Sequence, residues 1–303
     1  MKLAVIGGSG LIGSTTAFMT AEKGVYEEIK LLGRRENRLK SHAMDMEHAL
    51  MPFSDTKVTV GEAKDLSDCE VIFIAAASSE AGLVSREEGI AANFKIMSDI
   101  ARDIKKYAPE AITLVVTNPI DAFNYYLYKE IGGERGKRLG FGANDSLRFK
   151  WAVAKKFSLE FNKLYGFCIG EHGSTQVPLF SSLKYEGKPL NISEETKKEM
   201  KQMLLNWFDE FIGLKSQRSS GWTSAVLASD ILSAIATDSG EVIACSIPLC
   251  GEYGESEASA GLPVSLSKNG ATPLLLPITD EEKTAFSDSV SNIKRQIKLI
   301  FED

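Results

Sequence analysis

A glycine-rich segment near the N-terminus constrains the fold of this chain more than any other feature of its sequence. The segment consists of Gly7, Gly8, Ser9, Gly10, Leu11, Ile12 and Gly13. It follows the apolar residues 2–6 and precedes residues 14–23, which are compatible with a helix. In this order, glycines let the backbone approach a pyrophosphate at the start of the helix. The segment therefore predicts a dinucleotide-binding turn, and the alternative is a merely tight connection between strand and helix.

The first half of the chain alternates short apolar runs with longer amphipathic segments. The apolar runs cover residues 2–6, 29–32, 71–75 and 113–117. Strands that are apolar at nearly every position, separated by segments long enough for crossover helices, indicate a parallel sheet covered on both faces. We therefore expect an α/β fold with a doubly wound parallel sheet over residues 1–142.

The pattern changes beyond residue 142, and a second domain of α+β type is expected over residues 143–303. Helices are predicted at residues 146–157, 193–212 and 224–237, and strands at residues 164–169, 242–249 and 262–266. A hairpin is expected at residues 185–189. Thr279 and Glu282 form a capping box that starts a final helix, which runs to about residue 300. A chain of 303 residues has room for two such domains.

Composition excludes several classes of function. The net charge is -6, so there is no basic excess to bind a polynucleotide or an anionic membrane. No apolar run reaches the roughly eighteen residues that a membrane-spanning helix needs, and no signal peptide precedes the first strand. The four cysteines lack the close pairing of zinc or redox motifs and are expected to be reduced thiols. We therefore expect a cytoplasmic protein that binds neither nucleic acid nor membrane.

The residues after the second predicted strand bear on the choice of dinucleotide. Enzymes that use NAD usually carry an acid there, which binds the ribose hydroxyl groups. This chain instead has Gly33, followed by Arg34 and Arg35. A guanidinium at that place can pair with the 2′-phosphate of NADP, which a carboxylate would repel. The sequence favours NADP, and NAD remains the alternative if both arginines are ordinary surface charges.

A second group of polar residues forms a candidate catalytic site. The chain has three histidines, of which His42 and His48 fall within a predicted helix, whereas His172 lies beside glycines just past a predicted strand. An imidazole suits general acid–base chemistry near neutral pH. Asp145 and Arg148 stand three residues apart at a helix start, so both can face one side. There the acid can orient an imidazole and the arginine can bind a carboxylate. The alternative is an ordinary surface ion pair with a structural histidine.

Several motifs then follow one another in a fixed order along nearly the whole chain. They are the glycine loop, Val116-Thr117-Asn118-Pro119-Ile120-Asp121, Asp145-Ser146-Leu147-Arg148, Gly170-Glu171-His172-Gly173, Gly251-Glu252-Tyr253-Gly254 and Gly261-Leu262-Pro263-Val264. This order resembles the lactate/malate dehydrogenase family. The glycine loop and the segment at 33–35 look closest to archaeal-type malate dehydrogenases that use NADP. The resemblance implies a Rossmann fold followed by a substrate domain, with hydride transfer between NAD(P)H and a small 2-oxoacid or 2-hydroxyacid.

The resemblance also implies roles for individual residues. His172 would exchange the hydroxyl proton, Asp145 would orient it, and Arg148 would bind the substrate carboxylate. Asn118 would hold the nicotinamide side and the substrate oxygen, and its bond to Pro119 matches a position that is often cis in the family. No metal is implied.

Two further residues match the family less closely. Arg86 corresponds to a loop arginine that polarises the substrate carbonyl once the loop has closed. Ser220 corresponds to a hydroxyl in the substrate pocket, and a helix-capping serine is the alternative.

The chain departs from the family pattern where malate enzymes usually carry a Pro-Arg pair, whose arginine binds the second carboxylate. Residues 78–82 read Ser-Ser-Glu-Ala-Gly, and either Glu80 or Ser79 occupies the specificity position, depending on the alignment. Neither side chain attracts a dicarboxylate, so we expect a 2-oxoacid whose side chain is neutral or cationic. The alternative is that Glu80 points to solvent. Residues 140–145 are also one residue shorter than in the family.

Two other functions remain open at this stage. A family 4-like glycosidase shares the dinucleotide fold and uses NAD and a metal, but such chains are longer and carry a Cys-Asn metal motif that is not found here. A catalytically idle NAD(P)-binding sensor would explain the irregular specificity loop. The family usually forms homodimers or homotetramers, and residues 45–48 resemble its subunit contact.

Overall fold

The computed structural model describes residues 1–78, 86–216 and 220–301 of the chain. Most of its strands form one nine-stranded sheet in the order β14-β13-β12-β6-β5-β4-β1-β2-β3. The first half of the chain contributes β1 (Lys2–Ile6), β2 (Glu28–Leu32), β3 (Lys57–Val60), β4 (Val71–Ile74), β5 (Ile112–Val115) and β6 (Arg138–Phe141). The second half contributes β12 (Val242–Cys250), β13 (Ser256–Ser267) and β14 (Gly270–Pro273).

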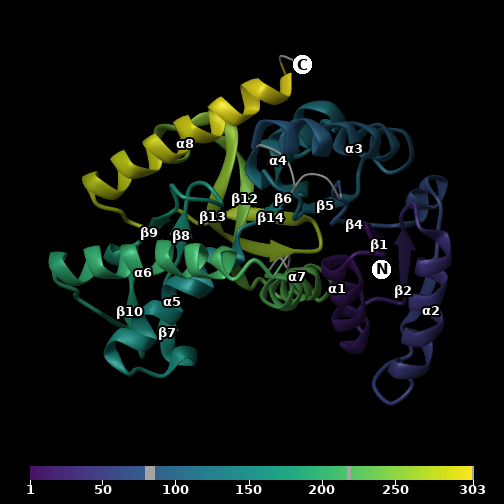
Figure 1. Ribbon diagram of the computed structural model, residues 1–303, viewed down its shortest axis with the longest axis horizontal. Coiled ribbons are helices and arrows are strands. Elements are labelled where there is room, and N and C mark those ends of the chain that lie inside the picture. The colour runs from purple at the N-terminus through teal and green to yellow at the C-terminus, as the bar shows by residue number, and fades with distance from the viewer. Residues whose placement is uncertain (79–85, 217–219, 302–303) are drawn as a thin grey trace.

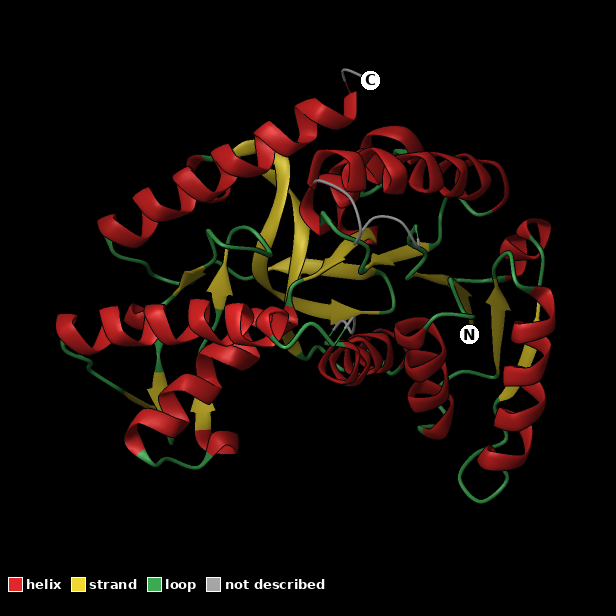
Figure 2. Cartoon of the chain, in the orientation of Figure 1, coloured by secondary structure: helices red, strands yellow, loops and turns green. Residues whose placement is uncertain are grey.

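The six strands of the first half are parallel and follow the spatial order β3-β2-β1-β4-β5-β6. This order is that of a doubly wound dinucleotide-binding sheet. The crossover helices are α1 (Leu11–Glu22), α2 (Glu36–Leu50), α3 (Arg86–Tyr107) and α4 (Ile120–Ile131). Figures 1 and 2 show helices on both sides of the strands, with α3 and α4 above and α1 below. The predicted α/β class is confirmed.

The extent of burial explains which strands could be predicted from the sequence. Every residue of β4 and β5 is buried, so these strands are apolar at nearly every position. In contrast, β3 was not predicted, because it lies at the sheet edge and none of its residues is fully buried. The strand β6 was also missed because it begins with Arg138, whose buried guanidinium donates hydrogen bonds to the carbonyls of Pro109 and Ala111.

The second half extends the same sheet with antiparallel strands and adds a smaller unit. Its helices are α5 (Ala143–Phe157), α6 (Glu194–Gly213), α7 (Gly221–Ala236) and α8 (Asp280–Phe301). Its short strands are β7 (Leu164–Tyr165), β8 (Cys168–Ile169), β9 (Val177–Pro178), β10 (Lys184–Tyr185) and β11 (Lys188–Pro189). Short 3₁₀ helices lie at Ala63–Asp68, Arg135–Lys137, Phe161–Lys163, Phe180–Ser182 and Glu252–Gly254. The β10–β11 hairpin and the capping box at the start of α8 match the predictions.

One predicted strand, over residues 164–169, is wrong as a single element. It is two strands in different sheets, because β7 pairs with β10 whereas β8 pairs with β9. Gly166 separates them, at a place so crowded that an added Cβ would lie 2.8 Å from Leu183 Cδ1. The apolar run is continuous because both strands are near the core, so periodicity alone could not divide it.

The hydrophobic core follows this division. The larger cluster covers both faces of the nine-stranded sheet and includes residues of α7 and α8, so the sheet and its core continue past the predicted boundary at residue 142. That boundary stays a prediction. A smaller cluster lies between α5 and α6, around Phe149 and Phe180. No helix in the described part of the chain has the length and apolar character needed to span a membrane.

Candidate active site

The glycine loop forms the turn from β1 into α1. Gly7 has a φ of +93°, and a Cβ there would lie 2.6 Å from the backbone of Ala75 and Ala76, at the end of β4. A Cβ on Gly13 would overlap the carbonyl oxygen of Gly7. Only glycine fits either position, so the loop packs directly on the neighbouring strand and helix.

The start of α1 leaves room for a ligand. Gly10 is the N-cap residue, and no side chain caps the first N–H groups of the helix. A Cβ on Gly10 would meet only the Gly7 oxygen, at 3.4 Å. Free N–H groups at a helix start favour a phosphate. The loop therefore fits the pyrophosphate of a dinucleotide.

The residues expected to distinguish NADP from NAD lie beside this loop. Gly33 follows β2, and a Cβ on it would lie 3.7 Å from Ser9 Oγ. Arg34 and Arg35 are exposed, and within the described residues neither forms an ion pair. Both guanidinium groups are therefore available to an anionic ligand.

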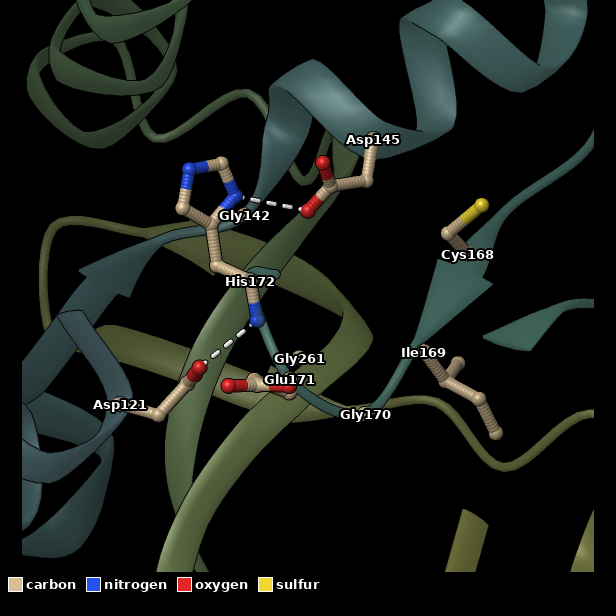
Figure 3. Close-up of a pocket in the computed structure, with 9 residues that line it drawn as sticks. All are labelled: Asp121, Gly142, Asp145, Cys168, Ile169, Gly170, Glu171, His172 and Gly261. Carbon is tan, nitrogen blue, oxygen red and sulfur yellow. Dashed lines mark hydrogen bonds and ion pairs between the residues drawn. The ribbon is translucent and has the colours of Figure 1, made fainter. Parts of the chain in front are cut away.

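The predicted histidine and acid lie in direct contact. Asp145 is buried in the first turn of α5, and His172 follows β8 after Gly170, whose φ is +88°. The Nδ1 atom of His172 lies 2.7 Å from Oδ2 of Asp145 (Figure 3). Burial by itself lowers the pKa of His172, but the adjacent Asp145 carboxylate raises it, and the net shift is upward. The acid thus fixes the ring and stabilises its protonated form.

Arg148 lies on the same face of α5 as Asp145. Its Nη1 is 3.9 Å from Oδ1 of Asp145, and its Nη2 donates a hydrogen bond of 3.2 Å to Ser220 Oγ. Its guanidinium also lies 4.2 Å from the centre of the Trp207 ring of α6. Burial lowers the pKa of Arg148, and Asp145 opposes this shift. Ser220 is the N-cap residue of α7, but its side chain caps no N–H group there, so its hydroxyl faces the arginine.

Asn118 is exposed at the end of β5, and the Asn118–Pro119 bond is cis, as predicted. The carbonyl of Asn118 accepts a hydrogen bond of 3.0 Å from Asn93 Nδ2. Asn93 Oδ1 in turn accepts one of 2.8 Å from the backbone N–H of Ser78. This buried amide joins the segments that follow β4 and β5.

Three predicted residues are described in part or not at all. Ser79 and Glu80 lie outside the described residues. Arg86 is the first residue of α3, and its side chain is not described.

Sequence reasoning missed two acids next to His172. Asp121, in the first turn of α4, accepts a hydrogen bond of 2.7 Å from the backbone N–H of His172. Glu171 is buried and accepts a hydrogen bond of 2.6 Å from Gln296 of α8. The only local signal for Asp121 was an acid at a helix start, which the helix dipole explains equally well. Asn93, within α3, carried no signal.

The two groups of residues lie next to each other. Gly221, which follows Ser220, is so close to Leu11 of α1 that an added Cβ would lie 2.9 Å from Leu11 Cδ2. The glycine loop, Asn118 and Asp145 also all follow strands of the parallel sheet, at the edge where such folds bind ligands. No cluster of metal-binding side chains is found within the described residues. A dinucleotide-binding turn beside an imidazole–carboxylate pair and a guanidinium defines the class of nicotinamide-dependent dehydrogenases.

Comparison with known proteins identifies the family within this class. A family model described as lactate/malate dehydrogenase, NAD binding domain, matches residues 1–140. A second, described as lactate/malate dehydrogenase, alpha/beta C-terminal domain, matches residues 144–303. The chain belongs to the lactate/malate dehydrogenase family and is an NAD(P)-dependent 2-hydroxyacid dehydrogenase.

Individual relatives agree with this assignment. The malate dehydrogenase of Bacillus thuringiensis (strain Al Hakam) is 32% identical over 99% of this chain and 98% of its own length. The malate dehydrogenase of Cryptosporidium parvum superposes with a TM-score of 0.92 at 26% identity, covering 100% of this chain and 99% of that one. The lactate dehydrogenase of the same organism, solved with lactic acid and β-nicotinamide adenine dinucleotide, gives 0.91 at 27% identity, covering 100% and 98%. The resemblance to the lactate/malate dehydrogenase family is confirmed, whereas the likeness of the cofactor loop to NADP-using members stays a prediction. The glycosidase and idle-sensor alternatives find no support.

Proposed function

We propose that the enzyme reduces a 2-oxoacid with His172 as the proton donor, and oxidises the 2-hydroxyacid with His172 as the proton acceptor. The observation that carries this proposal is the 2.7 Å contact between His172 Nδ1 and Asp145. Since Nδ1 is engaged by the acid, Nε2 is the atom that exchanges a proton with the substrate oxygen. The nicotinamide supplies or accepts the hydride.

The neighbouring residues have complementary roles in this proposal. Arg148 binds the substrate carboxylate with two parallel hydrogen bonds, and Ser220 and Trp207 orient its guanidinium. Asn118 contacts the nicotinamide side and the substrate oxygen. Arg86 polarises the substrate carbonyl.

We propose NADP as the preferred cofactor. Arg34 and Arg35 are exposed, form no ion pair among the described residues and directly follow Gly33, which lies beside Ser9. They favour a 2′-phosphate, and no carboxylate takes the place of Gly33. NAD is the second candidate. The comparison is kcat/KM with NADPH and with NADH, for the wild type and for R34Q/R35Q. If the arginines bind the phosphate, only the NADPH value falls in the variant.

For the substrate, we propose a 2-oxoacid whose side chain is neutral or cationic. The support is the sequence at Ser79 and Glu80, where malate enzymes usually place an arginine. The relatives are named malate dehydrogenases, so the test must include oxaloacetate. Efficient reduction of oxaloacetate, with no use of other 2-oxoacids, would exclude this substrate class.

The experiment for the function as a whole follows NAD(P)H absorbance with a panel of 2-oxoacids. His172→Ala is expected to abolish turnover while the dinucleotide still binds. Cofactor binding without turnover of any 2-oxoacid by the wild type would contradict the proposal. Lys283→Ala, at an exposed position of α8 and away from the proposed subunit contact, serves as the control and should keep wild-type turnover.

We further propose that two copies associate through α1, α2 and α7. Residues of these helices, among them His42, Asp45 and Trp222, line a cavity of about 330 Å³. Trp222 is 62% exposed and Met44 67% exposed, and exposed apolar groups of this size indicate a contact surface. Light scattering decides between monomer, dimer and tetramer, and Trp222→Glu is expected to lower the mass.

All four cysteines are free, which fits the cytoplasmic location that we propose.

A further inference from the structure

Asp121 is a buried acid on the opposite side of His172 from Asp145. Its side chain is 2% exposed, and its Oδ2 accepts a hydrogen bond of 2.7 Å from the backbone N–H of His172, 51 residues away in the sequence. Figure 3 shows Asp121 reaching the backbone of His172 while Asp145 reaches the ring. An asparagine could accept the same hydrogen bond without the cost of burying a charge. The carboxylate therefore requires an explanation beyond backbone support.

The loop that carries His172 needs anchors, because glycines lie at positions 170 and 173. One anchor is neutral: Ser289 Oγ accepts a hydrogen bond of 2.8 Å from the backbone N–H of Glu171. The other anchor, Asp121, carries charge. The two anchors hold adjacent residues of the same loop. Removing the Ser289 hydroxyl therefore tests the position of the loop, whereas neutralising Asp121 tests the effect of its negative charge.

Within the described part of the chain, the charged groups that act on Asp121 are Glu171 and His172 on the loop. Asp145 and Arg148 of α5 act on His172 from the other side. The Glu171 carboxylate accepts hydrogen bonds from Gln296 and Thr175. Asp121, Asp145 and His172 line one cavity of about 10 Å³, so little solvent separates them. Burial raises the pKa of Asp121 to about 6, and the neighbouring Ser246 and His172 oppose that shift. The charge of Asp121 raises the pKa of His172, and Asp145 raises it by a larger amount.

We propose that Asp121 is a positioning residue for proton transfer: its carboxylate holds the His172 backbone and its negative charge stabilises the imidazolium across the loop. The inference rests on the proton-transferring role proposed for His172. Two acids then act on one histidine, one through the ring nitrogen and one from the backbone side. Neither acid needs to contact the substrate.

The test compares Asp121→Asn, which keeps a hydrogen-bond acceptor, with Asp121→Ala, which removes it, and with Ser289→Ala, which removes the neutral anchor. The pKa of His172 is measured by NMR in the protein without ligands. The chain has three histidines, so single substitutions of His42 and His48 assign the signals. This readout does not depend on turnover, so it separates failure of this inference from failure of the proposed function.

The expected result is a lower pKa for His172 in Asp121→Asn and an unchanged one in Ser289→Ala. In oxoacid reduction, activity falls as pH rises through the pKa of His172, so the fall moves to lower pH in Asp121→Asn. Asp121→Ala is expected to lose a further factor in kcat, up to roughly a hundredfold, because the ring is displaced. The KM for the dinucleotide should not change. An unshifted His172 pKa in Asp121→Asn, or an equal shift in Ser289→Ala, would overturn the proposal, even if Asp121→Ala does not fold.

Discussion

Replacing Asp145 by Asn isolates the charge that acts on the His172 ring. The two side chains are 2.7 Å apart and largely shielded from water, so the carboxylate stabilises the imidazolium with little screening. A hydrogen bond to a charged group contributes about 1.5–3 kcal/mol. At about 1.4 kcal/mol for each tenfold change in rate, kcat/KM for oxoacid reduction near neutral pH is expected to fall about 10- to 150-fold.

The pH dependence gives a second measurement of the same effect. Asp145 raises the pKa of His172 in the folded protein. That upward shift contributes stability that is present below the unfolded pKa, about 6.5, and is lost as pH rises through the folded value. Asp145→Asn should therefore be less stable than the wild type under mildly acidic conditions, and this contribution should vanish at higher pH. The rate profile for reduction should shift to lower pH.

The assay is kcat/KM across the pH range for both directions of the reaction, together with chemical unfolding at several pH values. Asp288→Asn, an exposed acid of α8, provides the matched control and should behave like the wild type. An Asp145→Asn enzyme within about threefold of wild-type kcat/KM, with an unmoved pH profile, would refute the assigned role of this contact.

Three other changes have definite expected outcomes. Arg148→Lys loses the planar pair of donors, so the KM for the oxoacid should rise at least tenfold while dinucleotide affinity, measured by fluorescence, stays constant; an unchanged KM would contradict carboxylate binding there. Gly13→Ala should lower both the melting temperature and the dinucleotide affinity, because the added Cβ overlaps the Gly7 oxygen. Gly10→Ala should lower the affinity alone. Equal melting temperatures in the two variants would show that the turn tolerates a side chain at position 13. Asp121→Asn should be more stable than the wild type above about pH 6. The pKa of Asp121 is raised from 3.8 to about 6, so the wild-type protein loses stability as the pH rises between these two values. The gain is about 1–3 kcal/mol, measured by urea unfolding at several pH values, and a gain that persists near pH 4 would have another origin.

The sequence by itself determined the features that depend on neighbours along the chain. The glycine loop, the fully buried strands β4 and β5, the helix α2 and the capping box of α8 follow from local sterics, burial period and capping. Ordered motifs were enough to bring His172, Asp145 and Arg148 into one hypothesis. Local patterns did not predict β3, whose residues are only partly buried, or β6, whose first residue is the charged Arg138.

Only the tertiary structure decided which distant groups meet. The contact of Asp121 with His172, the hydrogen bond from Gln296 to Glu171 across 125 residues, and the placement of Trp207 against Arg148 join segments that share no local pattern. The pairing of β6 with β12, which carries one sheet across both halves, is of the same kind. Each depends on how helices and strands dock, and side-chain periodicity fixes which face of an element is buried but not which partner covers it.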